Sequence, residues 1–141
     1  MSQEMILLPA LALGFWTFSI LILIPFRRIR ARNSGAAALD DFALGESANV
    51  PADAVLVNRN YMNLLEMPIV FYVASLMLYV TGAASTLSLV LCWAYVGARI
   101  GHTLVHLIYN NVIHRVIIFA ISNLLLLTLW IHLTSTLLAL S

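Results

Sequence analysis

Residues 85–109 read STLSLVLCWAYVGARIGHTLVHLIY, an apolar run that is interrupted at intervals by polar side chains. A helix needs about 20 mostly apolar residues to cross the hydrocarbon core of a bilayer, and this stretch is long enough. A helix also pairs its backbone polar groups internally, as the membrane interior requires. The stretch therefore predicts a membrane-spanning helix.

The composition of the whole chain also indicates a membrane protein. The 141 residues are 62% hydrophobic and 9% charged, against about 45–50% and about 25% in soluble domains. Mean hydropathy is +0.99, and a soluble chain of this length could not bury so much apolar surface. A net charge of +1 without a basic stripe excludes a nucleic-acid partner. The single Cys92 excludes a disulfide framework within the chain.

Three further apolar runs accompany the first, so we predict an all-α integral membrane protein with four transmembrane helices in one domain, residues 1–141. The expected helices cover about 5–26, 54–80, 85–109 and 113–139. The first is expected to end at Pro25 and the arginines after it. The runs are too continuous for the alternating strands of a β-barrel.

Arginines cluster directly after the first apolar run, at Arg27, Arg28, Arg30 and Arg32. Basic residues close to a membrane end favour the cytoplasmic side. We therefore expect the 27–53 loop to be cytoplasmic and both termini to face the opposite side. The turn at Asn110-Asn111 then also falls on the cytoplasmic side.

The second predicted helix carries Arg59, Asn63 and Glu66, at spacings that place all three on one helical face. Ionisable groups inside a membrane are costly and mark functional sites by default. Two interpretations remain open from the residues alone. The three side chains form a binding site, or an Arg59–Glu66 ion pair bridged by Asn63 holds helices together.

The third predicted helix carries a longer stripe of polar and aromatic residues. It comprises Tyr95, Arg99, His102, His106 and Tyr109. At 1.5 Å per residue the stripe covers roughly 20 Å of helix, which favours a pocket or solvated cleft over a single structural hydrogen bond. His102 and His106 are spaced for two ligands to one metal, but no acidic cluster accompanies them, so we expect no metal.

Both patterns resemble motifs of the MAPEG superfamily, the membrane-associated proteins of eicosanoid and glutathione metabolism. Residues 59–66 resemble the family's helix-two pattern Arg-x3-Asn-x2-Glu, and residues 96–103 are similar to its helix-three motif. Arg115 stands where the family has an arginine at the start of helix four. The likeness covers nearly the whole chain and points to a bacterial-type member similar to the microsomal glutathione transferases.

The resemblance implies a homotrimer in membrane lipid, with glutathione bound between adjacent subunits near the cytoplasmic side and a lipophilic small molecule as second substrate. It implies that Arg115 stabilises the glutathione thiolate, since a nearby cation lowers a thiol pKa. The residues expected to bind glutathione are Arg59, Asn63, Glu66, Arg99, His102, Tyr109 and Arg28.

The sequence departs from the family pattern at one position. The well-known enzymes have a tyrosine seven residues after the helix-three arginine, and His106 stands there in this chain. We expect His106 to donate a hydrogen bond to the glutathione sulfur or to a ligand carboxylate.

Three functions are compatible with these residues. The first is a glutathione-dependent enzyme that transfers a thiolate to lipophilic electrophiles or reduces lipid hydroperoxides. The alternative is a non-catalytic trimer that binds a lipid, a thiol or a partner helix, which the absence of tyrosine at His106 favours. A small exporter would suit a lone membrane carboxylate, but Arg59 on the same face as Glu66 argues against it.

Overall fold

The computed structural model describes residues 2–43 and 45–140, and within them the chain is helical, as predicted. The short 3₁₀ helix η1 (Gln3–Ile6) leads into α1 (Leu7–Asn33). A loop with the 3₁₀ helix η2 (Asp40–Phe42) connects it to α2 (Ala52–Leu65) and α3 (Met67–Val80). The chain then forms α4 (Thr86–Ile108) and α5 (Val112–Leu140).

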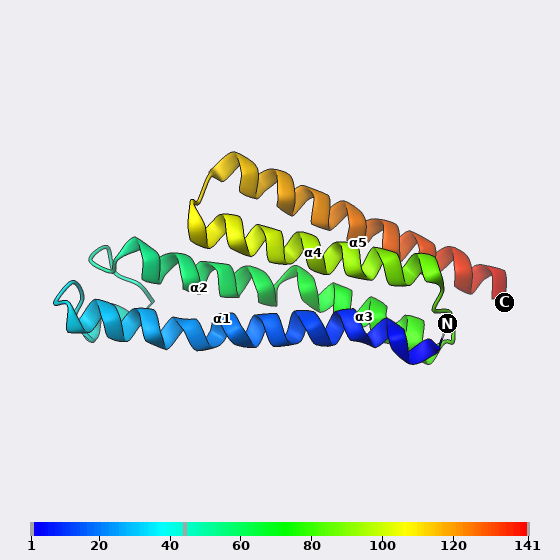
Figure 1. Cartoon of the computed structure of the whole chain (residues 1–141), viewed down its shortest axis with the longest axis horizontal. Helices are drawn as coiled ribbons and strands as arrows, with labels where there is room; N and C mark the ends of the chain where they lie inside the picture. Colours follow the sequence, from blue (N-terminus) through cyan, green and yellow to red (C-terminus); the bar gives the residue numbers. More distant parts are fainter. Residues whose placement is uncertain (1, 44, 141) are drawn as a thin grey trace.

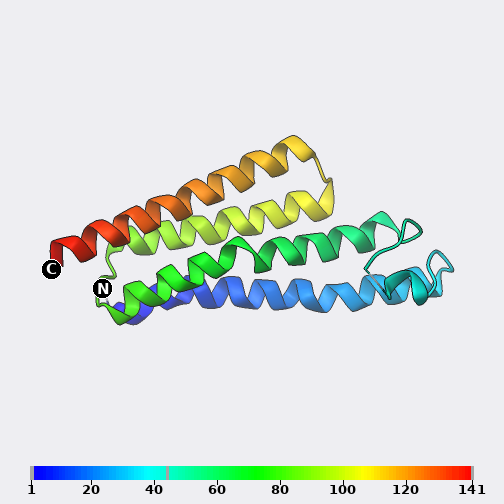
Figure 2. The ribbon, with the colours of Figure 1, turned by 180° about the vertical axis from the view of Figure 1, so that it is seen from behind.

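Four helical spans are long and apolar enough to cross a membrane: Gln3–Asn33, Ala52–Val80, Thr86–Ile108 and Val112–Ala139. Figures 1 and 2 show them running up and down beside one another, with both chain ends at one end of the bundle. The opposite end carries residues 34–43 and 45–51 and the turn between α4 and α5, and we call it the loop end. The protein is therefore an integral, multi-pass membrane protein.

The first span extends further than the sequence predicted. The expected helix stopped at residue 26, whereas α1 continues through Pro25 to Asn33. Proline removes one backbone hydrogen bond, which a transmembrane helix tolerates. The helix instead ends where Gly35 adopts a φ of 72° and the Ala36 amide bonds the Ala31 carbonyl, a Schellman closure that glycine favours.

Contacts with the following loop stabilise this extension of α1. Arg27 Nη1 pairs with Asp53 Oδ2 at 3.0 Å, across to the start of α2. A small apolar cluster also forms here from Ala31, Ala37, Val50 and Ala54. As a result α1 and α2 project past the α4–α5 turn at the loop end (Figures 1 and 2).

The second span is broken in the middle rather than continuous. The predicted helix 54–80 is divided into α2 and α3 at Glu66, which has φ −82° and ψ −90°. Pro68 explains the break, because it has no N–H to donate to the Leu64 carbonyl and its ring disfavours helical backbone just before it. The break leaves the last carbonyls of α2 without their usual helical partners.

The topology can be tested with single cysteines, because the native Cys92 is fully buried. Ser34 and Thr81 are exposed at opposite ends of the bundle. We expect Ser34→Cys to react with an impermeant maleimide only from the cytoplasmic side, and Thr81→Cys only from the other side. The unsubstituted chain is the control and should stay unlabelled in intact membranes. Labelling of both variants from one side would contradict the four-span arrangement.

Candidate functional site

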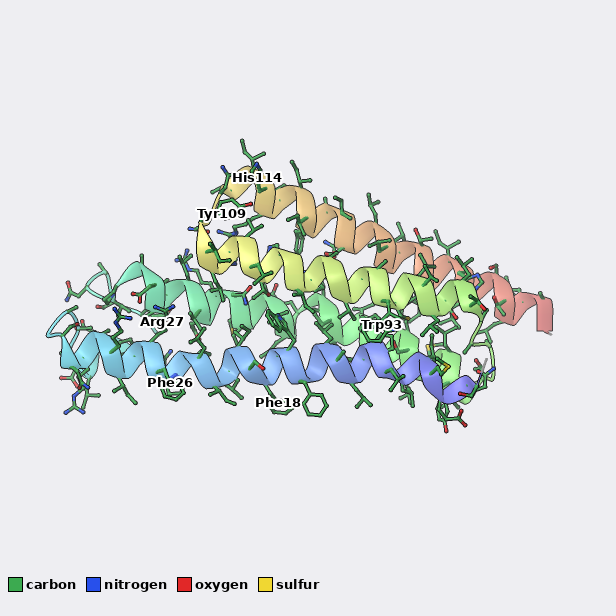
Figure 3. The ribbon with its side chains drawn as sticks, viewed as in Figure 1. Phe18, Phe26, Arg27, Trp93, Tyr109 and His114 are labelled. Atoms are coloured by element: carbon green, nitrogen blue, oxygen red, sulfur yellow. The ribbon has the colours of Figure 1, made fainter. Side chains whose placement is uncertain are left out.

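The polar stripe of α4 faces the interior of the subunit. Tyr95, Arg99, His102 and His106 are all buried. Tyr109 is different: it is 55% exposed, and its hydroxyl contacts His114 Nδ1 at 3.0 Å beyond the turn. Figure 3 shows Tyr109 and His114 together at the loop end of α4 and α5. The stripe is thus a buried face that ends before Tyr109.

Arg99 is fully buried and is held by two neutral groups. Its Nη2 donates a hydrogen bond to the backbone carbonyl of Asn63. Its guanidinium carbon lies 5.5 Å from the centroid of the Phe119 ring, a cation–π contact from α5. An unbroken helix would occupy the Asn63 carbonyl with the amide of residue 67. The break at Glu66 therefore provides the acceptor that Arg99 uses.

A pocket of about 200 Å³ lies beside Arg99. It is lined by Asn63, His102, Val112, Arg115, Val116 and Phe119. Three of the residues predicted from the sequence, Asn63, His102 and Arg115, thus come together from α2, α4 and α5. Because Asn63 and Phe119 both contact Arg99, that guanidinium lies directly behind the pocket wall.

Arg115 is positioned by the turn between α4 and α5. Its Nη1 donates to Asn110 Oδ1 at 2.7 Å, while its buried Nε has no partner within the described part of the chain. Asn110 has a φ of 48°, in the left-handed region that asparagine and glycine tolerate best. The turn thus orients Arg115 through one hydrogen bond and leaves other N–H groups of the guanidinium, that of Nε among them, without a partner in the described residues.

A second pocket, of about 480 Å³, adjoins the first at the loop end. Glu46 and Ser47 of the loop, Arg59 of α2 and Asn110 contribute its polar lining. Asn110 connects the two pockets, because its side chain contacts Arg115 in the smaller one. Arg59 is exposed in the subunit and faces this larger pocket.

Arg59, Arg99 and Arg115 have no carboxylate partner within ion-pair distance among the residues that the structure describes. The ion pairs recorded there are Arg27–Asp53 at 3.0 Å and Arg28–Glu46 at 3.5 Å. The ion pair that the sequence allowed between Arg59 and Glu66 is therefore not formed within the subunit. An uncompensated charge in low dielectric is costly unless a ligand or partner supplies the opposite charge.

The remaining predicted residues lie outside the smaller pocket. Glu66 is exposed at the break between α2 and α3. His106 is fully buried, and neither ring nitrogen has a hydrogen-bond partner in the described structure. Arg28 lies near the edge of the larger pocket, held by Glu46 and by the Phe42 ring at 5.2 Å. Across residues 2–43 and 45–140, no three His, Cys, Asp or Glu side chains are grouped to hold a metal ion.

Sequence reasoning missed four residues that shape the site. Asn110 was assigned only to a turn, although it orients Arg115. Phe119 supports Arg99, and Glu46 lines the larger pocket, and no periodic signal marks either. Asn60 is fully buried with both side-chain polar atoms unpartnered in the described chain. Its signal was available, since a buried amide inside a membrane span needs a hydrogen-bond partner.

Comparison with known proteins gives one positive result. The sequence model of the MAPEG family matches residues 6–135, a range that includes every residue of both pockets. No curated protein and no solved structure gave a significant match to the chain.

The Asn110–Arg115 hydrogen bond gives a test of the site. Asn110→Gly keeps the left-handed backbone favourable but removes the acceptor. We expect it to weaken binding of glutathione, the thiol that the resemblance implies, by about tenfold, the size of one hydrogen bond to a charged group. Isothermal titration calorimetry on folded protein measures this. Asn111→Ala is the matched control, because Asn111 Oδ1 accepts from the His114 amide, while the Asn111 backbone carbonyl that accepts from the Arg115 amide is kept in the variant. Equal losses in both variants would contradict the assignment.

Proposed function

The chain belongs to the MAPEG family, and we propose that it is a glutathione-dependent membrane enzyme. In one reaction the glutathione thiolate attacks a lipophilic electrophile, and the electrophile releases its leaving group or takes up a proton. In the other, two glutathione molecules reduce a lipid hydroperoxide to an alcohol and water and become a disulfide. The observation that carries the proposal is the set of three arginines around the pockets that lack carboxylate partners in the described subunit.

Glutathione matches this charge pattern. It has two carboxylates, one ammonium group and a thiol. Guanidinium groups bind carboxylates in a bidentate manner, and the interaction strengthens where water is excluded. We assign the carboxylates to Arg59 and Arg99, the ammonium to Glu66, and polar contacts to Asn63 and His102. The MAPEG family is associated with glutathione, which agrees with this assignment.

Arg115 is the residue that we assign to the thiol. A fixed positive charge next to a thiol favours the thiolate, which is the nucleophile. Arg115 stands in the first turn of α5, where the positive end of the helix dipole adds to the effect. Its buried, unpartnered Nε offers a hydrogen bond that a sulfur could accept. Asn110 neutralises none of this charge, since an amide oxygen is uncharged.

The position of Glu66 supports a homotrimer with glutathione between subunits. Glu66 is exposed on the outside of a membrane-spanning segment. A carboxylate facing lipid is expensive, so a neighbouring subunit and the ligand ammonium would both stabilise it there. We place the loop end on the cytoplasmic side because of its arginine cluster. Glutathione would then enter from the cytoplasm, and the lipophilic substrate from the bilayer.

One observation favours the alternative, a non-catalytic trimer that binds a lipid, a thiol or a partner helix. His106 replaces the tyrosine of the well-known enzymes and lies fully buried outside the lining of both pockets. In that position it does not reach a ligand in the smaller pocket directly. His106, Tyr109 and Arg28 therefore have weaker claims to a role in catalysis or binding than Arg115 and Arg59, which line the pockets. Arg99 is also fully buried outside both linings, but it contacts Asn63 and Phe119 of the pocket wall and acts on a ligand from behind them.

The role of Arg115 can be tested directly. Arg115→Ala should raise the pKa of bound glutathione and abolish the ultraviolet thiolate absorbance at neutral pH. Conjugation to a model electrophile should slow by at least about tenfold, while glutathione affinity changes less. Arg115→Lys should recover part of the signal, because charge matters more to a sulfur than the planar fork.

His114→Ala is the matched control, because His114 neighbours Arg115 in sequence but contacts Tyr109 instead. It should keep both the thiolate signal and the conjugation rate. A thiolate signal that is equal in wild type and Arg115→Ala would contradict the role assigned to Arg115. Glutathione that stabilises the wild type against heat but gives no thiolate at all would identify the non-catalytic trimer.

A further inference from the structure

A separate pocket of about 250 Å³ lies at the loop end of α1, apart from the two pockets already described. It is lined by Arg28, Ile29, Arg32, Leu39 and Phe42. Two guanidinium groups and three apolar side chains thus share one hollow, and no carboxylate lines it. This combination matches a ligand that has both an anionic group and an apolar part.

The side chains of the two arginines differ in their contacts. Arg28 is fixed between Glu46, at 3.5 Å, and the Phe42 ring, at 5.2 Å. Arg32 is exposed, and its side chain has no hydrogen bond or ion pair among the residues described. Arg28 is therefore held in place, while Arg32 has its full hydrogen-bonding capacity free for an anion.

The apolar side of the pocket continues into the lipid-facing surface of α1. Leu39 is 62% exposed, and Ile29 and Phe26 are 56% and 65% exposed. Figure 3 shows Phe18 and Phe26 projecting from the side of α1 that faces away from α2 and α4. An acyl chain lying along this surface would end at the pocket.

The depth of the pocket fits the headgroup region. The 27 residues of α1 span about 40 Å at 1.5 Å per residue, against about 30 Å of hydrocarbon core. The excess is at the loop end, where α1 projects past the α4–α5 turn (Figure 1). Arg28 and Arg32 therefore lie where the core ends and lipid phosphates begin.

We propose that this pocket binds the phosphate headgroup of an anionic phospholipid, whose acyl chains lie against α1. The free guanidinium of Arg32 and the outer edge of Arg28 bind the phosphate, while Ile29 and Leu39 contact the glycerol and upper chain. Basic pockets at the cytoplasmic ends of spans bind anionic headgroups in this manner. The exposed leucine and isoleucine argue for a lipid, because they gain nothing from a water-soluble anion.

Native mass spectrometry of detergent-purified protein tests the proposal, with phosphatidylglycerol and phosphatidylcholine of identical chains as probes. Wild type should bind phosphatidylglycerol preferentially. Arg32→Gln should reduce that preference by about tenfold, as expected for a charge-assisted contact to phosphate. The substitution should not disturb folding, because Arg32 is exposed and holds no other side chain.

Arg30→Gln is the matched control. Arg30 belongs to the same arginine cluster, is also exposed, and does not line the pocket. It should change the preference by less than twofold. Equal reductions in the two variants would mean general attraction to a basic segment and would overturn the proposed site. So would equal binding of both lipids to the wild type.

Discussion

The burial of Arg99 inside an apolar bundle is the constraint on which the rest of this site depends. A guanidinium cannot lose its charge under physiological conditions, and its desolvation costs several kcal/mol unless the protein replaces the lost water. Here the Asn63 carbonyl and the Phe119 ring replace part of that water, while Arg99 Nε and Nη1 are buried without a hydrogen-bond partner among the described residues. The carbonyl and the ring are available only because α2 ends before Pro68 and α5 packs closely on α4. The break between α2 and α3 and the packing of α5 against α4 thus both provide contacts to the Arg99 side chain.

The loop end of the bundle brings a polar and a partly apolar pocket close together. Helices α1 and α2 extend beyond the α4–α5 turn (Figure 1). Residues of the loop, Arg59 and Asn110 line a polar pocket there. The smaller pocket adjoins it through the Asn110–Arg115 contact, and its apolar lining consists of Val112, Val116 and Phe119. The Asn110–Arg115 hydrogen bond thus joins a polar lining to a partly apolar one.

Much of this architecture could be predicted from the sequence, because it depends on periodicity. Apolar runs located four spans, and the three- and four-residue spacing of the α4 stripe identified a face that the structure buries. Other features depend on contacts between distant residues. Pro25 did not end α1, since Asp53 and the small apolar cluster support the extension. An Arg59–Glu66 ion pair was one of two interpretations that the spacing left open, and it does not form in the subunit: Arg59 faces the larger pocket, whereas Glu66 is exposed at the break between α2 and α3.

The arginines of this protein have either carboxylate or neutral partners, and the kind of partner differs between regions of the structure. Near the loop end of α1, Arg27 and Arg28 are matched by the carboxylates of Asp53 in α2 and Glu46 in the loop, so their fields largely cancel. Around the pockets, neutral dipoles fix the guanidinium groups instead: a carbonyl and an aromatic face for Arg99, and an amide oxygen for Arg115. A neutral partner fixes the orientation of a guanidinium group without cancelling its charge. The positive electrostatic potential of Arg99 and Arg115 therefore remains at the pocket. A buried ion pair is often no more stable than well-packed neutral partners, so the neutral partners of Arg99 and Arg115 are compatible with a stable fold and still leave these charges uncancelled.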